Sequence, residues 1–164
     1  MTMKTYVKNF LCYLVALFGL LGFISLFSSS LEIYDELKDS WMIFKVKAYV
    51  GTSSNGYKGN VFPIFGYILP LVCGLVLIIE SFQPSWGKNI HLINTFMALI
   101  FFFSAVLVLL TKELFLSANK LGEFVNIRNG KGPIFSAVCS TVAGSLLLFV
   151  TYFPSQTKIE FIEK

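Results

Sequence analysis

One carboxylate and one imidazole lie close together in this sequence, where one long apolar segment ends and the next begins. Glu80 falls near the end of the first segment and His91 near the start of the second. Such a pair at one water interface can relay a proton or contribute to a metal site. Two polar side chains that reach from helix ends to water produce the same pattern, and we favour this simpler interpretation.

Other residues with reactive side chains are isolated. Cys12, Cys73 and Cys139 each fall inside an apolar stretch and form no C-x-x-C pair, which disfavours a disulfide or thiol redox chemistry. The sequence also lacks an H-E-x-x-H motif, a Walker A motif and a dinucleotide fingerprint. We therefore expect no catalytic residues, no cofactor and no metal, and a protein that is not an enzyme.

The segments that carry these residues have the composition of membrane helices. Of the 164 residues, 55% are hydrophobic and only 13% are charged, and the mean hydropathy is +0.74. Four apolar stretches each reach the roughly 20 residues that a helix needs to cross a bilayer. We predict a single all-α membrane domain over residues 1–164, a four-helix bundle with spans at 9–30, 61–82, 90–112 and 132–153.

The charges around the first span predict its orientation in a cell membrane. Lys4 and Lys8 precede the span, whereas acidic residues follow it, so both termini are expected in the cytoplasm and the loop 31–60 outside. The count over the whole chain favours the opposite orientation, because more Lys and Arg residues lie on the loop side. A cleaved signal peptide is the alternative for the first span, but the apolar run 10–27 exceeds the usual 7 to 15 residues of a signal core.

The loop 31–60 shows two local patterns. Apolar residues recur at helical spacing, which predicts a short interfacial helix: Leu31, Tyr34, Leu37 and Trp41. From Phe44 to Val50 apolar and polar residues alternate, and the Asn55-Gly56 turn then predicts a small β-hairpin. We expect Trp41, Phe44 and Val46 to pack onto the outer ends of the helices or into the membrane interface. The candidate contact surface exposed to water comprises Lys45, Lys47 and Tyr49.

The segment between the third and fourth spans mixes apolar and polar residues. We expect the third helix to extend beyond the membrane or to turn along its surface. The run Asn129-Gly130-Lys131-Gly132-Pro133 should break it and start the fourth helix.

Small residues at every fourth position indicate which helices pack closely. Two spans carry such a ridge of candidate packing residues: Gly66, Pro70 and Gly74 in the second, and Gly132, Ser136, Ser140 and Gly144 in the fourth. We expect packing within one chain, with a homo-oligomer as the alternative. The third span carries Phe101, Phe102 and Phe103 in succession and is expected to be the most lipid-facing helix.

The layout resembles small four-span membrane proteins of unknown function from Gram-positive bacteria. The resemblance rests on the long first loop, on Phe65-Gly66-Tyr67 entering the second span, and on Gly132-Pro133-Ile134-Phe135-Ser136 through Gly144 in the fourth. It implies a multi-pass bundle and supplies no activity, cofactor or site residue.

Two functions fit the sequence. The first is interaction, as an accessory, scaffold or sensor subunit with the lipid bilayer and a protein or a second copy as partners; no basic cluster points to nucleic acid. The alternative is a small channel or transporter for an uncharged or weakly polar solute. Its candidate lining residues are Asn94, Thr95, Ser104, Ser136, Ser140 and Thr141. A continuous polar path would favour transport, whereas a dry interior with a structured loop would favour interaction.

Overall fold

A computed structural model describes residues 3–35, 39–45, 49, 57–82, 89–120 and 126–152. Its helices are α1 (Met3–Ile24), the 3₁₀ helix η1 (Ser25–Phe27), α2 (Phe62–Phe82), α3 (Ile90–Leu109), α4 (Thr111–Asn119) and α5 (Lys131–Tyr152). Four of them, α1 (continued by η1), α2, α3 and α5, are long and apolar enough to cross a membrane, which indicates a multi-pass membrane protein. The four predicted helices are therefore confirmed, although α1 begins before the predicted residue 9.

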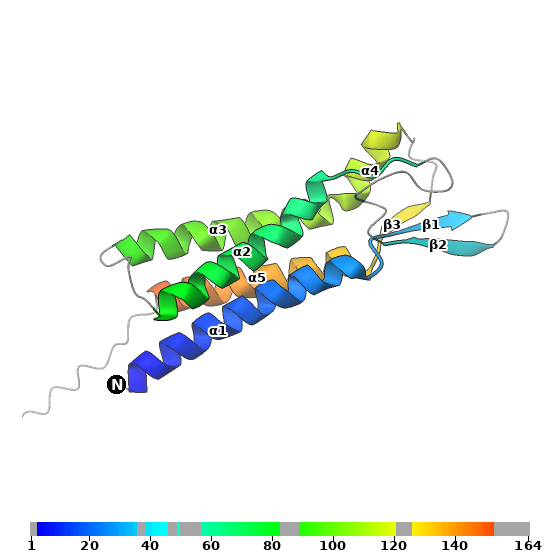
Figure 1. The fold of residues 1–164 in the computed structure, drawn as a ribbon. Helices are drawn as coiled ribbons and strands as arrows, with labels where there is room; N and C mark the ends of the chain where they lie inside the picture. The colour runs from blue at the N-terminus through cyan, green and yellow to red at the C-terminus, as the bar shows by residue number, and fades with distance from the viewer. Residues whose placement is uncertain are drawn as a thin grey trace, which may run out of the picture.

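The four long helices form a bundle in which each packs against two neighbours, in the cyclic order α1, α2, α3, α5. Figure 1 shows the start of α1 and the end of α5 at one end of the bundle, and the strands and α4 at the other. All four helices contribute to one apolar core in the middle of the bundle. Its buried members are Val15, Cys73, Leu77, Met97, Ala98, Phe101, Ala143 and Leu147.

The third span, α3, is no more exposed than the first two. Phe101 is fully buried in the core and only Phe103 of the three consecutive phenylalanines is strongly exposed. The buried share of the span is 39%, the same as in the first two. The expectation that it is more lipid-facing than the other spans therefore holds only against α5, whose buried share is 44%; against α1 and α2 it was wrong, because Ala98 and Ala105 allow α5 and α2 to pack closely on α3.

A three-stranded antiparallel sheet follows α1, where we had predicted a helix over residues 31–41. Its strands are β1 (Leu31–Asp35), β2 (Ser40–Phe44) and β3 (Ile127–Asn129), in the order β2-β1-β3. Leu31 and Ile33 alternate with Glu32 and Tyr34, and this period of two puts the first pair on an inner face and the second on an outer face. The helix prediction was wrong because the pairing partner Ile127 lies far away in the sequence.

The inner face of the sheet packs on α4 and closes a second, small core beyond the helix ends. Its buried members are Leu31, Ile33, Phe44, Phe115 and Ile127. The ring centroids of Phe44 and Phe115 lie 6.1 Å apart. Phe44 thus packs as expected, and the predicted extension of the third helix is present as α4, which begins after a break at Leu110.

The chain between η1 and β1 caps the start of α5. The Lys131 N–H donates to Ser29 Oγ and the Gly132 N–H to the Ser29 carbonyl, at 2.9 and 2.8 Å. The Gly130 N–H donates to the Ser30 carbonyl, and Pro133 has no N–H to satisfy. The amide groups that a helix start leaves without partners are therefore satisfied, and α5 begins where the sequence predicted a break.

Candidate functional site

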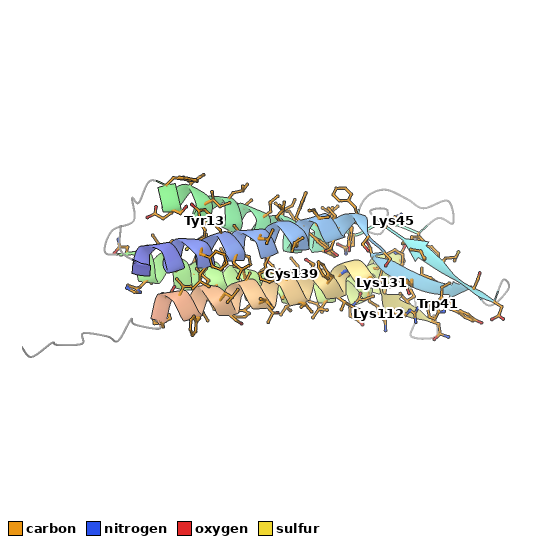
Figure 2. All side chains as sticks on the ribbon, turned by 90° about the horizontal axis from the view of Figure 1, so that it is seen from below. Tyr13, Trp41, Lys45, Lys112, Lys131 and Cys139 are labelled. Carbon is orange, nitrogen blue, oxygen red and sulfur yellow. The ribbon has the colours of Figure 1, made fainter. Side chains whose placement is uncertain are left out.

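The outer face of the sheet gathers polar and aromatic side chains beyond the ends of the helices. The strand register places five residues on it, here called the outer sheet face: Glu32, Tyr34, Trp41, Ile43 and Arg128. Ile43 pairs with Glu32 and Glu32 with Arg128, so these three form a row across the sheet. Figure 2 shows Trp41 on the sheet, past the helix ends.

Charge and aromatic contacts hold this face in one arrangement. The Arg128 Nε and Nη2 atoms both lie 2.7 Å from Glu32 Oε2, and the Arg128 Cζ lies 4.0 Å from the centre of the Trp41 ring. The Tyr34 and Trp41 rings are 5.3 Å apart, and the Tyr34 hydroxyl donates to Asp39 Oδ1. Because Arg128 comes from β3 and Trp41 from β2, the face forms only when all three strands are paired.

The outer sheet face remains open to solvent despite these contacts. Trp41 is 40% exposed and Ile43 is 61% exposed. Both lie on β2, which in the described part of the chain pairs only with β1 and is therefore an edge strand. Exposed Trp, Tyr and Arg on a rigid surface are the residue types that dominate binding energy at protein interfaces.

The predicted contact surface is only partly present. Lys45 is exposed, as expected. Tyr49 is fully buried, so its assignment to the water-exposed surface was wrong. The Trp41 ring does not pack onto the helix ends, because the strand register turns it to the outer face of the sheet; its packing into the membrane interface stays a prediction. Val46, Lys47 and the hairpin turn at 55–56 lie outside the described residues.

Tyr49 anchors the loop to the bundle instead. Its hydroxyl oxygen lies 2.7 Å from that of Tyr67 on α2, and their ring centroids are 5.6 Å apart. Burial raises the pKa of Tyr49, so its phenol stays protonated and keeps this hydrogen bond at neutral pH. Val108 and Ala137 complete the surrounding apolar cluster.

Glu80 and His91 have different surroundings. Glu80 is buried on α2, whereas His91 is exposed on α3, with its ring 6.4 Å from that of Tyr152. No group of three His, Cys, Asp or Glu side chains that could hold a metal occurs among the described residues. The proton relay or metal site therefore stays a prediction from the sequence.

The candidate lining residues for transport do not form a continuous path within one chain. Asn94 near one end is separated from Ser104 by the buried apolar layer of Met97, Ala98 and Phe101. Thr141 is exposed on the outside of the bundle, and Thr95 is within 2.7 Å of the Tyr152 hydroxyl. Ser136 and Ser140 are buried in the half nearer the sheet.

The small residues predicted for packing face neighbouring helices of the same chain. An added Cβ at Gly66 would lie 2.6 Å from Val108 Cγ1 on α3, and one at Gly74 would lie 3.0 Å from the Ala16 Cα on α1. An added Cβ at Gly144 would lie 3.2 Å from the Ala98 carbonyl oxygen on α3. Pro70, Gly132, Ser136 and Ser140 are also buried. Close packing within one chain therefore accounts for both ridges.

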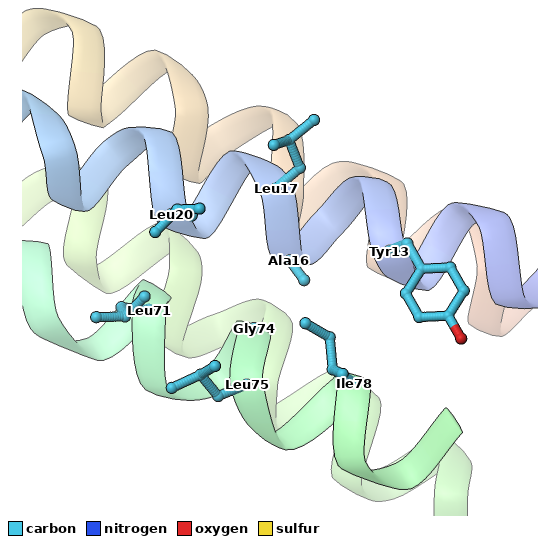
Figure 3. A pocket seen from close by; sticks show the side chains of 8 residues that line it. All are labelled: Tyr13, Ala16, Leu17, Leu20, Leu71, Gly74, Leu75 and Ile78. Atoms are coloured by element: carbon cyan, nitrogen blue, oxygen red, sulfur yellow. The ribbon is translucent and has the colours of Figure 1, made fainter. Parts of the chain in front are cut away.

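Among the described residues, grooves on the outside of the bundle lie on either side of α1. Figure 3 shows the first, of about 260 Å³, between α1 and α2, where every lining side chain except Tyr13 is apolar. The second, of about 340 Å³, lies between α1 with η1 and the start of α5. Its lining residues are Leu21, Ile24, Ser25, Ser28, Lys131 and Phe135.

Sequence reasoning missed Glu32, Tyr34, Ile43 and Arg128 as surface partners of Trp41. The alternation over residues 31–35 was the available signal for a strand. Comparisons with protein-family models, curated proteins and solved structures find no match to this chain.

Proposed function

We propose that this chain is inserted in the cell membrane through its four long helices and acts by interaction, as an accessory, scaffold or sensor subunit rather than an enzyme. The outer sheet face binds a protein partner. The observation that carries this proposal is the exposed Trp41 and Ile43 beside an Arg128 already held by Glu32. A preorganised aromatic and arginine surface loses little conformational freedom on binding, which favours affinity.

The interior of the bundle supports interaction over transport. The core layer around Phe101 interrupts the row of polar groups among the described residues, which argues against a hydrated route for a solute through one copy of the bundle. Ser136 and Ser140 are buried between packed helices, where small side chains let the helix backbones approach closely. These features fit a stable support for the sheet.

The proposed orientation places the sheet outside the cell and both termini in the cytoplasm. It rests on Lys4 and Lys8, which precede the apolar run of the first helix, and on Glu32 after that helix. The partner is accordingly an extracytoplasmic protein or the outer domain of another membrane protein.

Site-specific photo-cross-linking in living cells tests the proposal. A photoreactive residue at Ile43 should give a discrete adduct with one protein, and Trp41→Ala should abolish that adduct without loss of the membrane-inserted chain. A photoreactive residue at Ser117, exposed on α4 at the same end of the molecule, is the matched control. Absence of an adduct at Ile43, or an equal adduct from Ser117, would contradict the proposed surface.

A further inference from the structure

The groove between α1 and α5 differs from the apolar groove between α1 and α2 because it contains a cation. Lys131 is its one ionisable lining residue, beside the two serines, and lies where the bundle meets the sheet, as Figure 2 shows. Lys131 is the first residue of α5, and no further charged residue follows it in that helix. The groove therefore begins at the polar boundary of the apolar belt and continues into the belt.

The polar end of the groove offers hydrogen-bond donors that are not used within the described protein. No carboxylate among the described residues pairs with Lys131, whose side chain is exposed. Ser28 is held beside the start of α5, since an added Cβ at Gly132 would lie 3.6 Å from the Ser28 Cβ. The Ser25 hydroxyl, by contrast, already lies 2.6 Å from the Gly22 carbonyl oxygen.

The apolar end of the groove faces outward. Ile24 is 52% exposed and Phe135 is 50% exposed, on the side where a bilayer surrounds the bundle. The Lys131 ammonium and the Ser28 hydroxyl lie at one end of the groove, and the apolar side chains of Ile24 and Phe135 at the other. This order corresponds to the anionic headgroup and the acyl chain of a phospholipid. The first-turn amides of α5 are satisfied by Ser29 and Ser30, so the Lys131 ammonium is the main source of charge recognition.

We propose that this groove is a binding site for an anionic phospholipid, with the phosphate at Lys131 and Ser28 and an acyl chain along Ile24 and Phe135. The site is independent of the outer sheet face. A phospholipid bound there would hold the start of α5 at the membrane boundary, next to the segment that caps this helix.

Competition between lipids on the full-length protein tests the site. The chain is reconstituted in nanodiscs of phosphatidylcholine and phosphatidylglycerol, extracted gently, and its retained lipid is measured by native mass spectrometry. The wild type should retain phosphatidylglycerol preferentially, and Lys131→Gln should reduce this preference about fivefold, as expected for loss of one cation near the membrane surface. Lys131→Arg should keep the preference.

Lys58→Gln is the matched control, because it removes an exposed cation at the same end of the bundle but outside the groove. Equal loss in Lys58→Gln and Lys131→Gln, or a wild type without preference, would overturn the proposal. An excess of inorganic phosphate should leave the lipid bound, since the acyl chain contributes to binding; displacement by phosphate would contradict the proposed acyl-chain contact and would indicate a site for the free anion.

Discussion

At the scale of single residues, the hydroxyls of Tyr49 and Tyr67 connect the loop before α2 to the bundle. Tyr67→Phe removes one of them and leaves the buried Tyr49 hydroxyl without this partner. We expect a loss of about 0.5 to 1.5 kcal/mol in the free energy of unfolding, the usual contribution of one hydrogen bond, because Ser30 and Thr111 also interact with the Tyr49 hydroxyl. Thermal unfolding of the purified variants measures it.

The double variant Tyr49→Phe/Tyr67→Phe should be less destabilised than the sum of the two single variants, since either substitution alone already removes the hydrogen bond between the two hydroxyls. Tyr13→Phe is the control, because its hydroxyl is in an exposed contact with Ser81. Strictly additive effects of the two substitutions would show that the hydroxyls do not interact.

Arg128 contributes both to the shape of the outer sheet face and to stability. Its side chain is 59% exposed, but that of Glu32 is only 12% exposed, so loss of Arg128 leaves a largely buried carboxylate unpaired and should cost more than the roughly 1 kcal/mol of a fully exposed pair. Arg128→Gln should therefore lower the melting temperature and, in a Trp86→Phe background in which Trp41 is the emitting tryptophan, change the fluorescence spectrum. Unchanged fluorescence relative to Lys58→Gln would contradict the contact between Arg128 and Trp41.

Residue environments outside the spans were the least predictable from sequence. The alternation from Phe44 to Val50 indicates two faces but does not say which face is buried. Tyr49 fits the water-exposed face by this pattern, yet its ring reaches Tyr67 on α2. That contact depends on the path of the loop, which local periodicity does not encode.

At the scale of helices and strands, the packing between helices determines how much a substitution lowers stability. Ser140 is fully buried on α5, whereas Ser145 on the same helix is exposed. Ser140→Leu should force α5 away from its neighbours at a cost of about 1 to 3 kcal/mol, while Ser145→Leu should have little effect. Equal melting temperatures of the two purified variants in one detergent would contradict this arrangement.

The sheet predicts a pattern of amide exchange. β1 lies between β2 and β3, whereas β2 has a strand on one side only in the described chain. Amides of β1 should therefore exchange more slowly than those of β2 in hydrogen-exchange measurements on nanodiscs. Rapid, equal exchange in both strands would show that the sheet does not form stably and would remove the basis of the proposed binding surface.

At the scale of the whole molecule, the four spans could be predicted well because bilayer thickness fixes the length of an apolar helix, whichever helix it packs against. The sheet could not be predicted in this way, because each strand is short and β3 lies in the connection before α5, far from β1 in the sequence. The outer sheet face depends on pairing between Glu32 and Arg128, 96 positions apart. Sequence patterns within a short window do not contain such a contact.

Orientation is the property of the whole molecule on which the proposed partner depends. Lys4 and Lys8 favour a cytoplasmic amino terminus, and the first helix usually determines topology. The sheet end carries a larger number of cations, including Lys112 and Lys131, which favour the opposite orientation. Because the first helix inserts before these cations are synthesised, we expect the sheet to lie outside.

Cysteine labelling in intact cells measures this directly. Ser40→Cys places a thiol on an exposed position of β2, while the native Cys73 and Cys139 are buried in the bundle; the half-buried Cys12 is replaced by Ser in both chains. A membrane-impermeant maleimide should label Ser40→Cys before permeabilisation and should label the unmodified chain only weakly. Labelling of Ser40→Cys only after permeabilisation would place the sheet in the cytoplasm, and the partner of the outer sheet face would then be a cytoplasmic protein.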